Sequence, residues 1–202
     1  MKFDHSIVQT TFRSPLGTMI IAATDKGLAG LWFEGQRHLP KELTAPTLVA
    51  SRTSLPPEGA VLARGGPSRR TLTSTTVWPN DAQHPVLKKV IQQLTQYFSG
   101  QRTQFDVPLD LSGGTDFQQA VWQVLLAIPQ GRTASYSDVS QRIGKPAAVR
   151  AVGAAVGRNP VSIIVPCHRV VGVNGSLTGY AGGLERKTAL LKLEGALQET
   201  MF

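Results

Sequence analysis

The sequence has few of the residues that build disulfide, metal or membrane proteins. Only one of its 202 residues, Cys167, is a cysteine, so an internal disulfide or a metal site with several thiolates is excluded. No apolar run approaches the roughly 18 residues that cross a bilayer. The first residues lack the apolar core of a secretion signal. We therefore expect a cytoplasmic protein in a reducing compartment, without a membrane partner.

Acidic residues are also scarce relative to basic ones. Thirteen Asp and Glu stand against 21 Lys and Arg, which gives a net charge of +8 and a pI near 10.1. This excess favours a polyanionic partner, and nucleic acid is the first candidate. A basic surface that serves only solubility would have the same composition. The hydrophobic content of 41% is enough for a globular core.

The beginning of the chain has the pattern of a β-hairpin or meander. The pattern predicts strands over 7–12, 17–23 and 28–33, with turns at 15–17 and 25–27 that contain Pro and Gly. A helical period follows over 86–98 and ends at Gly100; its apolar positions are Val86, Leu87, Val90, Ile91, Leu94, Tyr97 and Phe98. We expect this helix to pack on the small sheet, to which residues 105–111 add a strand or an extended connection.

Residues 44–84 differ in composition from the segments around them. They contain Pro56-Pro57, Gly65-Gly66-Pro67 and a Thr/Ser run, without a sustained apolar period. This predicts a long loop or disordered insertion. Ser112-Gly113-Gly114 marks the expected boundary between an N-terminal domain, residues 1–112, and a C-terminal domain, residues 113–202.

The C-terminal part has the signals of successive helices. Thr115 can cap a first helix that Pro129 stops, and Ser135 with Asp138 forms a capping-box pattern at the start of a short helix through residue 143. After a turn at Gly144, a second helix is predicted over 147–156. A short helix, a glycine turn and a second helix indicate a helix-turn-helix.

The second of these helices carries small residues on much of its surface. Ala147, Ala151 and Ala154 make it thin, and Arg150 is its most prominent polar side chain. Such a helix can pack closely on another helix, or it can enter a groove about 6 Å wide such as the minor groove of DNA. Arg150 favours the second interpretation, because an arginine can enter the base stack.

The only cysteine lies in the segment Val-Ser-Ile-Ile-Val-Pro-Cys-His-Arg-Val-Val, residues 161–171. Its β-branched run at 163–165 predicts a short buried strand, and Pro166 then presents Cys167 at a bend. A lone cysteine is commonly a small buried hydrophobe. Here His168 and Arg169 follow it directly, and such neighbours lower a thiol pKa and activate the nucleophile.

Several segments together resemble the O6-alkylguanine-DNA alkyltransferases of bacterial type, which are direct-reversal DNA repair proteins. They are Arg150-Ala151-Val152-Gly153, Asn159-Pro160, Ile164-Val165-Pro166-Cys167-His168-Arg169-Val170 and Gly179-Tyr180-x-Gly182-Gly183-Leu184. The resemblance is dense over 117–195, weaker over 11–36, and absent from the insertion. It implies an α+β fold, with a ribonuclease H-like N-terminal sheet and helix domain before a winged helix-turn-helix-like domain.

The resemblance also implies roles for individual residues. Cys167 would accept the alkyl group from O6-alkylguanine. The product thioether is stable and nothing in the sequence suggests a means of removing it, so each molecule would act once.

 

By analogy, His168 takes the thiol proton through a water, Glu194 orients and charges that histidine, and Asn159 holds the turn of the active site. Tyr136 would rotate the phosphate and protonate the departing guanine. The expected catalytic residues are thus Cys167, His168, Glu194, Asn159 and Tyr136.

The lesion lies inside a duplex, so the resemblance implies that the base is flipped out through the minor groove. Arg150 would take the vacated position, and the residues expected at the DNA are Arg150, Tyr136, Ala147, Ala151 and Arg158. The loop 173–183 would wall the base pocket, for which we expect Tyr180, Val170, Ala181 and Gly182. Position 181 is Ala where some relatives carry a hydroxyl, so one hydrogen bond to guanine O6 is missing or comes from the backbone.

The implied reaction is a stoichiometric and irreversible transfer that also extends to O4-alkylthymine. It requires no cofactor, and we expect no zinc, because the N-terminal cysteines that hold zinc in some relatives are missing here. The expected partner is double-stranded DNA that contains alkylated bases, bound by a monomer. Two alternatives stay open: a protein that recognises alkyl lesions without repairing them, and a cysteine hydrolase that uses Cys167 and His168.

Overall fold

The computed structural model describes residues 7–44 and 78–197, and its N-terminal part is built on a three-stranded antiparallel sheet. The strands β1 (Val8–Ser14), β2 (Gly17–Thr24) and β3 (Gly27–Phe33) pair in chain order. All three predicted strands are confirmed. Alternate residues of β2 point to opposite faces, and both faces are covered, which explains why β3 is buried along its whole length.

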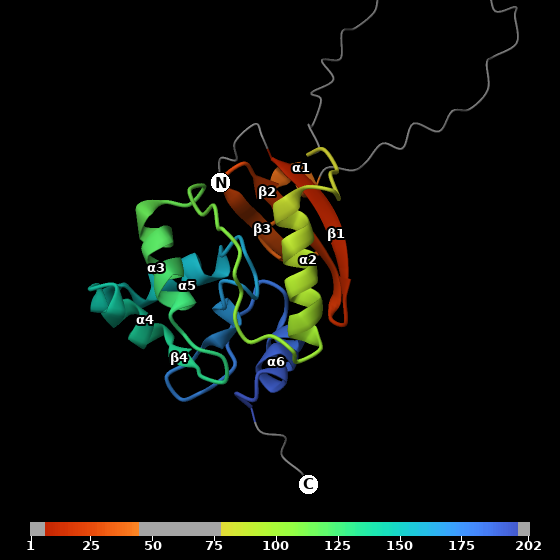
Figure 1. The fold of residues 1–202 in the computed structure, drawn as a ribbon. Coiled ribbons are helices and arrows are strands. Elements are labelled where there is room, and N and C mark those ends of the chain that lie inside the picture. Colours follow the sequence, from red (N-terminus) through yellow and green to blue (C-terminus); the bar gives the residue numbers. More distant parts are fainter. Residues whose placement is uncertain (1–6, 45–77, 198–202) are drawn as a thin grey trace, which may run out of the picture.

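The two faces of the sheet have different covers. Met19, Ile21 and Leu31 belong to the main core, into which the helix α2 (Pro85–Phe98) inserts its predicted apolar face. Figure 1 shows α2 running along the sheet. On the other face, Trp32 packs on Trp78, close to the short helix α1 (Lys41–Thr44).

The C-terminal part is mainly helical. Its helices are α3 (Asp116–Leu126), α4 (Tyr136–Arg142), α5 (Val149–Gly157) and α6 (Leu184–Leu193). Both predicted capping residues, Thr115 and Ser135, form capping boxes at the starts of α3 and α4. A 3₁₀ turn, η1 (Pro146–Ala148), precedes α5, so the second helix of the helix-turn-helix begins more tightly than predicted.

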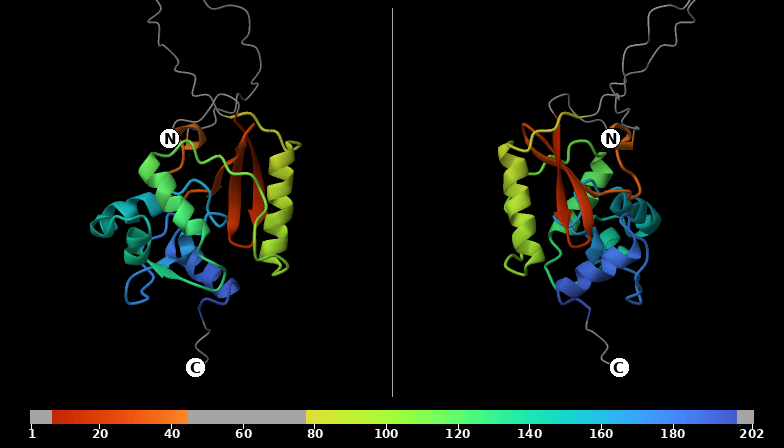
Figure 2. Two further views of the ribbon diagram at one scale, coloured as in Figure 1. Left: turned by 60° about the vertical axis from the view of Figure 1, so that its left-hand side comes forward. Right: turned by 90° about the vertical axis from the view of Figure 1, so that its right-hand side faces the viewer.

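Short strands and turns join these helices to the cysteine. A parallel pair of strands, β4 (Ala134–Ser135) and β5 (Val170–Val171), links the start of α4 to the residues after the 3₁₀ turn η2 (Cys167–Arg169). In both views of Figure 2 the three-stranded sheet stands between α2 and the helical part. The fold therefore brings the helix-turn-helix and the cysteine into one unit beside the sheet.

The edge of β3 that does not pair with β2 connects the two parts of the molecule. Leu31 donates its N–H to the carbonyl of Pro160 and accepts from the N–H of Ser162, both at 2.8 Å. Farther along the same edge, Leu28 donates to the carbonyl of Pro108 at 2.8 Å. Residues 105–111 thus form the extended connection that was one of the two expectations, with a single bridge at Leu109. The turn before the cysteine is anchored directly on the sheet.

Two predictions about local structure need correction. Residues 163–165 form turns instead of a strand, and Ile163 has a φ of 71°, which no strand residue adopts. The insertion predicted over 44–84 is too long at its C-terminal end, because Trp78 is buried and Gln9 donates to the carbonyl of Pro79. Residues 45–77 lie outside the described residues. None of the helices that the model describes combines the length and the apolar character needed to cross a bilayer.

Candidate active site

The single cysteine lies at the end of a buried, tightly wound turn. Residues 161–171 are all buried, and Cys167 is 5% exposed. Ile163 adopts the left-handed backbone region, which is strained for a β-branched residue and persists only where the surroundings hold it. Pro166 then starts η2, so Cys167 is at the first position of a 3₁₀ turn.

Asn159 holds this turn from inside. Its Nδ2 donates to the carbonyl of Val165 at 2.7 Å and lies 3.3 Å from that of Val161, while its Oδ1 accepts from the N–H of Val161 at 3.0 Å. The same Nδ2 lies 3.0 Å from Sγ of Cys167. One buried amide therefore connects the two ends of the turn and also contacts the sulfur.

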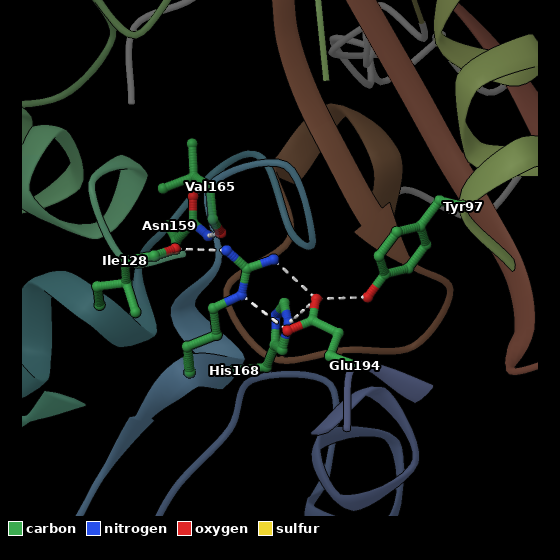
Figure 3. A network of polar contacts seen from close by, with 7 residues as sticks. Tyr97, Ile128, Asn159, Val165, His168 and Glu194 are labelled. Carbon is green, nitrogen blue, oxygen red and sulfur yellow. Dashed lines mark hydrogen bonds and ion pairs between the residues drawn. The ribbon is translucent and has the colours of Figure 1, made fainter. Parts of the chain in front are cut away.

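Behind the cysteine, buried side chains form a charged network (Figure 3). Nε2 of His168 lies 2.9 Å from Oε1 of Glu194, and Arg169 donates to both oxygens of that carboxylate at 2.8 Å. Arg169 also donates to the carbonyl of Ile128. Glu194 follows the last residue of α6, so the expected pairing of His168 with Glu194 is present in the structure.

The acid–base properties of the network follow from its burial. Burial alone would raise the pKa of Glu194, but hydrogen bonds and charge from His168 and Arg169 outweigh it and lower that pKa to about 2. Burial lowers the pKa of His168, so its imidazole is neutral at pH 7. Nε2 faces an ionised carboxylate and therefore carries the proton. Nδ1 has no hydrogen-bond partner among the described residues.

The thiol itself contradicts the expectation of a lowered pKa. Burial raises the pKa of Cys167 to about 11, more than the hydrogen bond from Asn159 and the charge of Lys187 lower it. The guanidinium of Arg169 points to Glu194 and does not reach the sulfur. Cys167 is therefore a thiol at rest, and a base must remove its proton before it can react.

A small pocket of about 130 Å³ opens in front of the sulfur. Of the expected residues, Cys167, Tyr136, Tyr180 and Ala181 line it; the others that line it are Arg37, His38, Gly153, Val156, Gly157 and Gly179. The hydroxyl of Tyr136 donates to the carbonyl of Thr178 at 3.2 Å, which joins α4 to the loop that walls the pocket.

Two residues expected in the pocket lie behind its wall. Val170 is fully buried, and its carbonyl accepts a hydrogen bond from Nζ of Lys187 at 2.6 Å. Gly182 is buried against the rings of Tyr180 and Phe33, where a Cβ would come within 2.8 Å of the Tyr180 ring. Neither residue lines the pocket in this structure.

Of the five residues expected at the DNA, all but the half-buried Tyr136 are exposed on the helix-turn-helix. Ala147, Arg150, Ala151 and Arg158 are all exposed, whereas Val152 belongs to the core. The helix α5 packs with its opposite side on α3 and α4, where Nε1 of Trp122 donates to the carbonyl of Ala155. The small residues of α5 therefore agree with both interpretations, close helix packing and close approach to a groove, because some of them pack on α3 and α4 and others face solvent.

Sequence reasoning missed several residues of the site. Arg37 and His38 reach the pocket because β3 ends next to it, and the N–H of Arg37 donates to the carbonyl of Ala181. Lys187 is fully buried, and the sequence analysis did not identify it. A lysine on the apolar face of a helix indicates a buried ammonium group that needs hydrogen-bond or charge partners. Among residues 7–44 and 78–197, no three His, Cys, Asp or Glu side chains gather as a metal site.

Comparison with known proteins agrees with this arrangement. Residues 7–111 match the ribonuclease-like domain of 6-O-methylguanine DNA methyltransferase, and residues 116–196 match the DNA binding domain of the same family. The chain belongs to this family. The α+β fold expected for the 6-O-methylguanine DNA methyltransferases, with a ribonuclease-like sheet domain before a helical DNA-binding domain, is thereby confirmed.

Individual members of the family are similar over much of their length. The methylated-DNA--protein-cysteine methyltransferase of Mycobacterium tuberculosis is 55% identical over 121 residues, which are 60% of this chain and 72% of that protein. The inducible protein of Bacillus subtilis is 63% identical over 102 residues, 50% of this chain and 56% of that one. A crystal structure of the M. tuberculosis O6-methylguanine methyltransferase covers 96% of each chain, at 38% identity and a TM-score of 0.70. Another, of M. tuberculosis OGT in complex with DNA, covers 92% of this chain and 91% of that one, at 40% identity and a TM-score of 0.68.

Proposed function

We propose that the protein repairs O6-alkylguanine in DNA by transferring the alkyl group to Sγ of Cys167, once per molecule. The observation that carries this proposal is the single cysteine at the base of a small pocket, backed by the buried pair of His168 and Glu194. Family membership supports the reaction class, since the relatives are named as methyltransferases that act on methylated DNA and a protein cysteine.

The chemistry is a single displacement in which the thiolate attacks the alkyl carbon. An S–C bond forms, the C–O6 bond breaks, and the electron pair of that bond goes to guanine. Because the thiol is protonated at rest, His168 must accept its proton. Nδ1 is the atom that can do so, through one bridging water, while Nε2–H stays on the carboxylate of Glu194. Tyr136 donates a proton to the departing guanine at the pocket, and the proton that His168 accepted restores the phenol of Tyr136.

The exposure of residues on α5 supports their proposed role at the DNA. Arg150 and Arg158 are exposed near the pocket mouth that Gly153 and Gly157 of α5 line, so this helix is placed to meet the duplex from which the base is flipped. Ala147 and Ala151 allow close approach to the minor groove. The proposed partner is double-stranded DNA that contains O6-alkylguanine, with O4-alkylthymine as a second substrate. We propose that a cytoplasmic monomer binds this DNA and needs no cofactor.

The test is the intact mass of the protein after incubation with duplex DNA that carries one O6-methylguanine. We expect a gain of about 14 Da, one methyl group, that saturates at one per chain and is absent from Cys167→Ala. Tight binding without any mass gain would instead indicate a protein that recognises lesions. Continued turnover beyond one equivalent would indicate a hydrolase.

A further inference from the structure

The charged network behind Cys167 includes a residue from the N-terminal domain. The hydroxyl of Tyr97, on α2, lies 2.7 Å from Oε1 of Glu194, 97 residues away in the sequence. Tyr97 is 1% exposed, and Figure 3 shows its hydroxyl directed at the carboxylate of Glu194. The sequence pattern had assigned this residue only to the apolar face of the helix.

The direction of this hydrogen bond is determined by its surroundings. Burial, and then the charge of Glu194, raise the pKa of Tyr97, so its phenol keeps its proton and must be the donor. Oε1 of Glu194 accepts from Tyr97, from Nη2 of Arg169 and from Nε2 of His168, and Oε2 accepts from Nε of Arg169. Three side chains from two elements, α2 and η2, thus hold one carboxylate.

Core packing alone does not account for a tyrosine at this position. The ring of Tyr97 packs on Phe98 and Phe105, with centroid distances of 5.3 and 5.4 Å, and a phenylalanine would make the same contacts. A buried hydroxyl needs a hydrogen-bond partner, and its only partner in the described part of the chain is Glu194. The hydroxyl therefore belongs to the network.

We infer that Tyr97 is a positioning residue for the transfer reaction, through which the ribonuclease-like domain holds Glu194 against His168. This inference rests on the proposed function. Arg169 donates to both oxygens of the carboxylate, and Tyr97 donates to Oε1 alone, so that Oε1 stays directed at Nε2 of His168. The hydrogen bond from Tyr97 also stabilises the negative charge on Oε1. It thereby limits how far Glu194 raises the pKa of His168.

The pH dependence of alkylation gives a direct readout of this role. Besides Tyr97 and Glu194, the groups that face His168 are Arg169 and Lys187, whose charges lower its pKa. Tyr180 is the further titratable group near Tyr97, and burial raises its pKa, so it stays uncharged between pH 5 and 9; Cys167 is the group that reacts. Removal of the Tyr97 hydroxyl leaves Glu194 more basic, so His168 becomes protonated at a higher pH and loses its function as a base there. Removal of the carboxylate has the opposite effect.

The experiment follows the rate at which free O6-benzylguanine alkylates the full-length protein between pH 5 and 9. Tyr97→Phe should slow the reaction about ten-fold at pH 7 and move the acid limb of the profile to higher pH. Glu194→Gln should move that limb to lower pH, and Tyr97→Phe should add no further loss in the Glu194→Gln background. Phe105→Leu, which disturbs the packing of the Tyr97 ring but keeps the hydroxyl, should lower the melting temperature without moving the limb.

The possible failures are distinct. If the wild-type protein is alkylated and Tyr97→Phe has the same rate and profile, the inference is wrong and the proposed function stands. Losses that multiply in the double variant would also overturn it, because Tyr97 would then act independently of Glu194. If the wild-type protein gains no alkyl group from either the free base or methylated DNA, the proposed function itself fails.

Discussion

Replacing Asn159 with alanine should disrupt the turn that presents the cysteine. Asn159 is 4% exposed and contacts the turn at Val161, Val165 and the sulfur of Cys167. It is also the side chain that closes the turn in which Ile163 adopts a φ of 71°. The substitution therefore removes hydrogen bonds and the restraint on a strained residue at the same time.

The loss of stability can be worked out from the backbone groups that lose their hydrogen-bond partner. The N–H of Val161 has only Oδ1 of Asn159 as acceptor among the described residues, and a buried donor without a partner costs about 1–3 kcal/mol. The carbonyl of Val165 still accepts from the N–H of Cys167, so its loss is nearer to the roughly 1 kcal/mol of an ordinary hydrogen bond. Together with the small cavity that the alanine leaves, we expect the free energy of unfolding to fall by about 3–4 kcal/mol.

The assays are thermal unfolding and the rate of Cys167 alkylation. For a chain of this size the loss corresponds to a fall of about 10 °C in melting temperature. Asn159→Asp keeps the acceptor for Val161 but directs a buried carboxylate at the carbonyl of Val165, so it should be no more stable than Asn159→Ala, and alkylation should stay slow. Asn174→Ala, which removes only an exposed acceptor, is the matched control. A fall of less than about 3 °C, with an unchanged alkylation rate in Asn159→Ala, would refute the reasoning.

Three further predictions concern other parts of the chain. Arg150→Ala should slow repair in duplex DNA at least about ten-fold more than reaction with a free guanine analogue, because Arg150 supports the flipped state; equal losses on the two substrates would exclude that role. Deleting residues 46–76 should leave repair of duplex DNA largely intact, and loss of folding, seen by circular dichroism, would show that the segment is structural. Acid should destabilise the fold in two steps: the folded pKa values of His168 and Glu194 are both depressed, so stability is lost below about pH 6.5 and again below about 4.5, which urea unfolding at each pH would measure.

The secondary structure was largely predictable because local signals agreed with the tertiary packing. The strands β1 to β3 are runs of strand-forming residues that turns separate, and Thr115 and Ser135 form capping boxes with residues three positions along the chain. Such features need only a few adjacent residues. They are therefore visible in the sequence without knowledge of the rest of the fold.

The residues of the active site could be predicted only where they belong to a recognisable sequence motif. The run at 163–165 has strand propensity, yet Asn159 and the edge of β3 hold it as a turn, and this tertiary context overrides propensity. The thiol pKa was misjudged because sequence neighbours do not reveal where a side chain points. Arg169 follows Cys167 in the chain but directs its charge to Glu194. Tyr97 was missed for the same reason, since its partner is distant in sequence.

A protonated thiol at rest suits a protein that can react only once. A thiolate with a low pKa would meet any soft electrophile that reached the pocket, and each such event would consume a molecule. Here the sulfur is buried and keeps its proton, and the neutral imidazole of His168 has one nitrogen without a hydrogen-bond partner among residues 7–44 and 78–197. Nucleophilicity then depends on proton transfer along a network that Asn159, Glu194 and the N-terminal domain hold in place. Reactivity is thus coupled to the assembled fold and not to the cysteine alone.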